Sequence, residues 1–280
     1  MRKWVLIIGI ALSWFLAWAI AGLPDGHLRV WFLDVGQGDA ILMRLPAGEW
    51  VMVDGGPDAK VLDWMGRIMP FYERQIELVV MSHPHADHIN GLVEVMQRFE
   101  VKNMLLSGVK YNYAGYQKIL EDAASQKTRL WYGQKEDWRI GKVGFDLLYP
   151  QRSLQGEEME NVNNSSIVFR LIYAGKRIFF SGDLEEKKER DLTQSGQRLK
   201  SEILKAGHHG SKTSSTEELL EAVKPYYAVI SCGVDNKFKH PFPGTLERLN
   251  DHGVTVFRTD IDGTVEVEID GEDVLMKSFI

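Results

Sequence analysis

The six residues His83-Pro84-His85-Ala86-Asp87-His88 constrain this chain more than any other stretch. Three imidazoles and one carboxylate within six positions are side chains that zinc binds. The mostly apolar segment 76–82 precedes them and reads as a strand, so the ligands begin where a buried strand reaches a loop. The H-E-x-x-H pattern of helical metalloproteases does not fit, because the spacing differs and the glutamate is absent. The motif therefore predicts a metal site.

The bulk properties are those of a globular protein. The 280 residues are 44% apolar and 26% charged, so the chain can bury a large core. The net charge of −6 supplies no global basic field for nucleic acid, although a local basic strip can lie in an acidic protein. Cys232 is the only cysteine and lies in an apolar run, which excludes an internal disulfide and a cysteine-rich zinc site.

Residues 1–26 predict a signal peptide or an N-terminal membrane anchor, followed by a short linker. Two basic residues precede an uncharged run at 4–21, which is short for a spanning helix and long for the core of a signal peptide. The small-x-small pattern at 19–21 leaves cleavage open. In either case the basic residues stay inside. The body is therefore expected to be extracytoplasmic, either secreted or anchored to the membrane by one helix.

Residues 27–280 read as one domain of alternating strands and helices. Strands are predicted at 28–34, 40–45, 49–54, 76–82, 101–106, 141–149, 166–173, 177–180, 203–206, 227–232, 254–258, 264–269 and 274–279, and helices at 61–68, 91–99, 113–126, 184–194, 216–223 and 245–251. The second half repeats the arrangement of the first. Such a pattern fits two sheets sandwiched between helices.

The first motif resembles the H-x-H-x-D-H signature of the metallo-β-lactamase superfamily. The resemblance implies an α/β (α+β) fold, a four-layer αββα sandwich, with a site for one or two metals at one edge. It assigns His83 and His85 to the first metal and Asp87 and His88 to the second.

Further ligands must come from other parts of the chain. Asp183 follows the strand 177–180 and resembles the aspartate that bridges both metals, although a helix N-cap is its alternative role. In Gly207-His208-His209-Gly210, His208 is the expected ligand of the second metal, and His209 the expected phosphate contact or proton donor. The reverse assignment stays open. Asp54 resembles the aspartate that supports the metal-binding loop through hydrogen bonds.

One ligand that many superfamily members have is missing, because no histidine occurs between His88 and His208. The polar loop there offers Asn163 and Asn164 as weak ligands or as residues that line the site. The first metal is then loosely held, or a water completes its coordination.

Several other stretches are similar to the C-terminal metallo-hydrolase domain of the competence protein ComEC. They are 33–40, 163–166, 204–215 and 240–243, together with 258–260 and Gly263. In that branch an Asn-Ser stretch usually replaces the third histidine. ComEC carries a multi-helix membrane channel, whereas this chain has one apolar segment and is not expected to form a channel.

The resemblance implies a metal-dependent hydrolase, a phosphodiesterase or nuclease acting on DNA, and the N-terminal segment predicts that it is exported. Two divalent ions, zinc or alternatively manganese, would activate a water. Asp87 and Asp183 are the expected catalytic carboxylates and orient that water. The expected phosphate contacts are Lys205, Ser211, Lys212 and His240. Lys237 and Lys239 are expected to form a second basic lip with His240. Plain surface solvation is the alternative for every one of these lysines, and capping of a turn is the alternative for His240.

Two other functions remain open. One is a metallo-hydrolase of another bond, such as a β-lactam, a lactone or a phosphocholine ester of the cell wall, because one fold supports many chemistries. The other is a non-catalytic binding or assembly protein, against which the intact ligand set argues. A nucleic-acid substrate is the expected partner, the membrane is a second one if the N-terminal segment is uncleaved, and no protein partner follows from the sequence.

Overall fold

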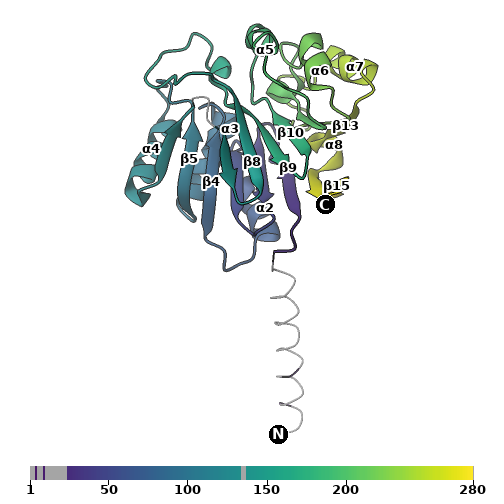
Figure 1. Cartoon of the computed structure of the whole chain (residues 1–280). Coiled ribbons are helices and arrows are strands. Elements are labelled where there is room, and N and C mark those ends of the chain that lie inside the picture. The colour runs from purple at the N-terminus through teal and green to yellow at the C-terminus, as the bar shows by residue number, and fades with distance from the viewer. Residues whose placement is uncertain (1–3, 5–8, 10–23, 134–136, 280) are drawn as a thin grey trace.

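The computed structural model describes residues 4, 9, 24–133 and 137–279. Its strands form two sheets that pack face to face, and helices cover both outer faces (Figure 1). The predicted signal peptide or anchor at 1–26 lies almost entirely outside these residues. Among the residues described, no helix combines the length and the apolar character that crossing a membrane requires.

The first sheet has eight strands in the order β15-β14-β1-β2-β3-β4-β5-β6. Their bounds are β1 Leu28–Phe32, β2 Ala40–Arg44, β3 Trp50–Gly55, β4 Gln75–Met81, β5 Glu100–Leu106, β6 Arg129–Tyr132, β14 Thr264–Ile269 and β15 Val274–Phe279. Strands β3 to β6 run parallel to one another. Their carboxyl ends therefore meet at one edge of the sheet.

The second sheet has seven strands in the order β13-β12-β11-β10-β9-β8-β7. Their bounds are β7 Trp138–Ile140, β8 Val143–Tyr149, β9 Val168–Tyr173, β10 Lys176–Phe180, β11 Ile203–Lys205, β12 Tyr227–Ile230 and β13 Thr255–Arg258. Strands β10 to β13 are parallel. This half of the molecule thus repeats the parallel arrangement of the first.

The helices form the two outer layers. Helices α2 (Lys60–Ile68), α3 (Ala86–Met96) and α4 (Ala114–Gln126) pack on the first sheet, and α5 (Glu186–Thr193), α6 (Glu217–Val223) and α7 (Pro243–Asp251) pack on the second. The short α8 (Thr259–Asp262) joins β13 to β14. The structure confirms the four-layer αββα sandwich.

The period of two along each strand divides its side chains between two cores. In β4, Leu78 and Val80 point between the sheets, whereas Val79 and Met81 point toward the helices. All four are buried, and each contributes roughly 1.5–3 kcal/mol to folding. Both faces of the sheet are covered, which explains why these strands read as apolar runs.

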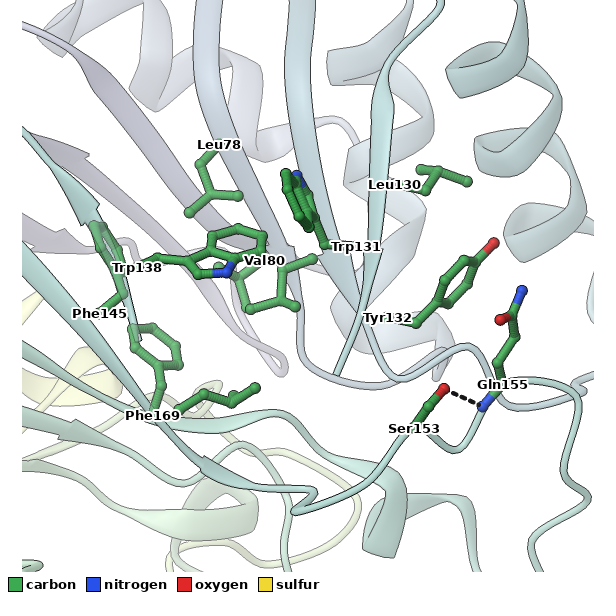
Figure 2. Close-up of a pocket in the computed structure, with 12 residues that line it drawn as sticks. Leu78, Val80, Leu130, Trp131, Tyr132, Trp138, Phe145, Ser153, Gln155 and Phe169 are labelled. Carbon is green, nitrogen blue, oxygen red and sulfur yellow. Dashed lines mark hydrogen bonds between the residues drawn. The ribbon is translucent and has the colours of Figure 1, made fainter. Parts of the chain in front are cut away.

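A cavity of about 330 Å³ remains between the sheets, near their edge strands β6 and β7 (Figure 2). Trp131, Trp138, Phe145 and Phe169 supply aromatic walls, and Gln155 lies at one side. No predicted site residue is among the residues that line it. The cavity is therefore separate from the predicted metal site.

Most predicted elements are present within a few residues of their predicted bounds. Three were missed, β6, β7 and α8, each of only three or four residues. Helix α3 begins at Ala86, whereas its predicted start was Gly91. Asp87 and His88 consequently lie on the first turn of a helix and not on a loop.

Candidate metal centre

The candidate metal ligands gather where parallel strands of both sheets end. His83 comes two residues after β4, Asp183 three residues after β10, and His209 four residues after β11. Asp54 is at the end of β3. Strand ends are rigid supports, so these side chains are held at one edge of the sandwich without long flexible loops.

The turn between β4 and α3 carries the H-x-H-x-D-H ligands. His83 and His88 are fully buried, while His85 and Asp87 are partly exposed. The Nε2 atom of His83 lies 3.0 Å from Nδ1 of His85, and the two rings are nearly perpendicular. Two imidazole nitrogens so close together are arranged to share one ion.

Asp183 is the common neighbour of the buried imidazoles. Its Oδ2 atom lies 3.3 Å from Nε2 of His88, 3.5 Å from Nε2 of His209 and 3.9 Å from Nε2 of His83. The preceding Gly182 has a φ of +52°, and a Cβ there would meet the Ser166 side chain at 2.8 Å. The tight backbone at this glycine lets the Ser166 hydroxyl accept the Asp183 N–H at 3.0 Å.

Four overlapping groups of the described side chains can hold an ion. They are His83, His88 and Asp183; Asp87, His88 and His209; Asp39, Asp54 and His88; and Asp39, Asp183 and His209. His88 Nε2, His209 Nε2 and Asp183 Oδ1 are buried and have no hydrogen-bond partner among the described residues. Unpaired buried polar atoms are costly, and imidazole and carboxylate are ligands for divalent ions. These residues therefore fit one or two divalent metals.

The adjacent histidines His208 and His209 differ in burial and in their neighbours. His209 is buried and joins Asp87 and His88, whereas His208 is in none of the candidate groups of described residues. Both residues have left-handed backbone, with φ of 49° and 54°. His208 keeps 23% of its side chain exposed, and its Nδ1 lies 3.6 Å from Oε1 of Glu185.

The carboxylates and imidazoles of the cluster shift one another's pKa values toward the charged forms. Burial by itself would lower the pKa of His88, but the carboxylates of Asp183 and Asp54 raise it well above its usual value. Burial opposes protonation of His209 too, yet Asp183 and Asp39 raise its pKa to about 10. Burial would raise the pKa of Asp183, and these imidazoles hold it well below the ordinary range. A bound cation would replace the protons on the imidazoles.

Asp54 makes hydrogen bonds to the loop that carries the candidate ligands. Its carboxylate accepts hydrogen bonds from the backbone N–H of Ser82 at 2.8 Å and from the Ser82 hydroxyl at 2.6 Å, and it lies 2.8 Å from Nδ1 of His88. The bond to Nδ1 leaves Nε2 of His88 facing Asp183. Asp54 thus orients the imidazole of His88.

Replacement of Asp54 with asparagine is expected to lower metal affinity about 10- to 100-fold, because partners that orient a histidine ligand have effects of this size. Competition with a chelator measures the affinity. Asp63, which is exposed on α2, offers the matched control, and Asp63→Asn should bind metal as the unmodified chain does. Equal affinities of both variants would contradict the supporting role.

Lys205, which was predicted to contact a substrate phosphate, is buried in the structure. It is 1% exposed, and its Nζ lies 2.8 Å from Oδ2 of Asp39 and donates to the Ala206 carbonyl. The other oxygen of Asp39 faces Nδ1 of His209 at 3.4 Å. Lys205 therefore neutralises a buried carboxylate behind a candidate ligand and does not face solvent. All three side chains of β11 are buried. The sequence alone did not show that the lysine of this strand is buried with its two apolar neighbours.

The other predicted contacts are divided between surface and interior. Lys212 is exposed, whereas Ser211 is buried and pairs with the Thr213 hydroxyl at 3.1 Å. The His240 ring lies 5.6 Å from that of His208. Burial and the nearby His209 and His208 lower the pKa of His240 to about 4, so it is neutral at pH 7 and adds no charge to a basic lip.

The asparagines of the polar loop take two positions. Asn163 donates to Glu185 at 3.1 Å, and its buried side-chain oxygen has no partner among the described residues. The side-chain oxygen of Asn164 accepts the backbone N–H of Glu185 at 3.2 Å. Asn163 therefore has the free oxygen that a weak ligand needs, and Asn164 acts in the framework of the loop.

Three acidic residues near the cluster were missed from the sequence: Asp39, Glu185 and Glu189. Asp39 follows two glycines of the turn 35–39 and precedes a buried strand, and it lies in the stretch 33–40 that is similar to ComEC. Glu189 lies on a charged helix and looked like a solvated residue. In the structure its carboxylate accepts the backbone N–H groups of Ser215 at 2.7 Å and Thr216 at 2.9 Å, which ties α5 to the end of the His208–His209 loop.

Glu189 makes stability depend on pH. Burial raises its pKa to about 7, from 4.5 for a free side chain. A raised carboxyl pKa contributes stability that is complete below pH 4.5 and is lost as the pH rises through about 7. Over that window we expect the unfolding free energy to fall by on the order of 3 kcal/mol more in the unmodified chain than in Glu189→Gln, which cannot titrate. Urea titrations at several pH values measure the difference, and parallel pH curves would contradict it.

Comparison with known proteins places the chain in a family. The family model described as the metallo-beta-lactamase superfamily matches residues 33–234, which contain every candidate ligand. The chain therefore belongs to the metallo-β-lactamase superfamily, and this fold indicates a metal-dependent hydrolase. The metallo-beta-lactamase fold protein YhfI from Bacillus subtilis shares the fold, with a TM-score of 0.57 at 10% identity over 88% of this chain and 100% of that one.

Within the superfamily the chain is similar to competence proteins. It is 30% identical over 273 residues to the competence protein ComA of Neisseria gonorrhoeae, a match that covers 95% of this chain and 35% of the relative. It is 27% identical over 252 residues to the ComE operon protein 3 of Bacillus subtilis, covering 84% of this chain and 32% of the relative. The chain thus spans about a third of the length of these relatives.

Proposed function

We propose that the chain is an exported phosphodiesterase that cleaves DNA strands with two bound divalent ions, zinc or alternatively manganese. The observation that carries this proposal is the position of Asp183, which belongs to two of the candidate groups and whose Oδ2 atom lies within 4 Å of the Nε2 atoms of His83, His88 and His209. A carboxylate with two oxygens among several imidazoles suits a pair of neighbouring ions. The similarity to competence proteins supports DNA as the substrate and the outer face of the membrane as the location.

Bound divalent ions would polarise a phosphoryl oxygen and activate a water. His83, His85, His88 and His209 would hold them, with Asp87 and Asp183 as the anionic ligands that also orient the water. His208 takes the part first expected for His209. It is partly exposed beside Asp183 and near Glu185, where it can donate a proton or a hydrogen bond to a phosphate oxygen.

The test is hydrolysis of single- and double-stranded DNA by the full chain, freed of metal and then supplied with zinc or manganese. Cleavage that depends on the added ion is the expected result. Two bound ions with turnover of a lactam or a lactone, but not of DNA, would overturn the substrate while leaving a hydrolase. Failure to bind any ion would overturn the site itself.

A further inference from the structure

An exposed aromatic ring lies at the rim of the candidate metal centre. Phe238 belongs to the loop between β12 and α7, and 53% of its surface is exposed. The Phe238 ring is stacked on that of His240, with centroids 5.8 Å apart and planes 22° apart. His240 in turn lies 5.6 Å from the ring of His208 and 6.4 Å from that of His209. A continuous series of rings thus leads from the candidate ligands to the surface.

The loop that carries Phe238 is held in place by hydrogen bonds. Asn236 accepts the backbone N–H of His240 at 2.9 Å, and its side-chain amide donates to the carbonyls of His240 and Gly233. Phe242 donates its N–H to Gly210 at 2.8 Å, which joins this loop to the one that carries His208 and His209. Phe238 is therefore presented by a fixed loop next to the cluster.

A positive charge lies against the same ring. Nζ of Lys237 is 4.9 Å from the centroid of Phe238, and Lys237 and Lys239 are both exposed. An exposed aromatic face flanked by cations is the combination that binds single-stranded nucleic acid, since the ring stacks on a base and the ammonium groups attract phosphates. A β-lactam or lactone would need neither the stacking face nor the lysines.

We propose that Phe238, supported by His240, stacks on an unpaired base of a DNA strand whose phosphate occupies the metal centre. This inference rests on the proposed function and adds a specificity to it. In a duplex the bases are paired and stacked on one another, so their faces are closed to Phe238. The site therefore favours single strands and frayed ends over intact duplex.

The test compares two single strands of equal length, oligothymidylate and the same backbone with every base removed. Phe238→Ala is expected to lower kcat/KM about 10-fold on oligothymidylate, mostly through KM, because stacking on one base has an effect of this order. The rate on the baseless strand should not change. Phe238→Trp should restore the rate on oligothymidylate, and Phe238→Leu, which is apolar but not aromatic, should not.

Each outcome separates the inference from the function on which it rests. Equal loss on both strands would show that Phe238 only supports the loop, and no loss on either would show that it contacts no base. Both results overturn the stacking and leave the nuclease intact. An unmodified chain that cleaves neither strand overturns the nuclease and the stacking together. Thermal unfolding and metal content of all variants confirm that they fold.

Discussion

Replacement of Asp183 with alanine is expected to lower metal-dependent hydrolysis on the order of 10³-fold or more. One carboxylate oxygen of Asp183 lies within 4 Å of the Nε2 atoms of His83, His88 and His209. Its removal takes the anionic ligand from the middle of the cluster, and ions held there supply several kcal/mol of transition-state stabilisation. Metal content per chain should fall together with the rate.

Two further variants make this result specific. Asp183→Asn keeps the shape of the side chain without its charge, so it should lose nearly as much activity. Asp191→Ala removes an exposed carboxylate from α5 and should retain both the rate and the metal content. An Asp183→Ala variant that binds two ions and turns over normally would remove Asp183 from the site.

Replacement of Lys205 with methionine is expected to lower the free energy of unfolding by about 3–5 kcal/mol. The change leaves the Asp39 carboxylate buried without its cation, and breaking a buried ion pair on one side has a cost of this size. Chemical denaturation measures the loss. Replacing Asp39 with asparagine in the same chain should recover part of it, because the double variant buries no unpaired charge.

The matched control is Lys187→Met on α5, where the lysine is exposed. Its unfolding free energy should stay within about 0.5 kcal/mol of the unmodified value. The alternative role predicts the opposite pattern for Lys205: unchanged stability, with weaker and less salt-dependent binding of DNA. That pattern would restore Lys205 as a phosphate contact.

The fold was largely predictable because most strands are buried on both faces and most helices are amphipathic. The elements that were missed lack such a periodic pattern of apolar residues. Strands β6 and β7 have only four and three residues, too few for a periodic pattern. The start of α3 was missed because its first turn carries the candidate ligands Asp87 and His88, and polar side chains interrupt the apolar period that marks a helix.

The site was predictable where candidate ligands are adjacent in the sequence. It was less predictable where the folded backbone determines which side chain reaches the cluster. His208 and His209 are chemically identical neighbours, and their sequence does not show which of them is the more deeply buried among the other candidate ligands. Lys205 looked like a surface cation because its partner, Asp39, is 166 positions away in the sequence. Contacts between distant segments are the information that a single sequence does not display.

The candidate ligands come from both sheets, His83 and His88 from the first and Asp183 and His209 from the second. An ion shared by His83 and Asp183 would cross-link positions 100 residues apart. In the chain-entropy description of a disulfide, closing a loop of that length restricts the unfolded chain by about 5 kcal/mol. With a single cysteine, the chain has no internal disulfide to do this. The ions that give the site its chemistry would also fasten one half of the sandwich to the other.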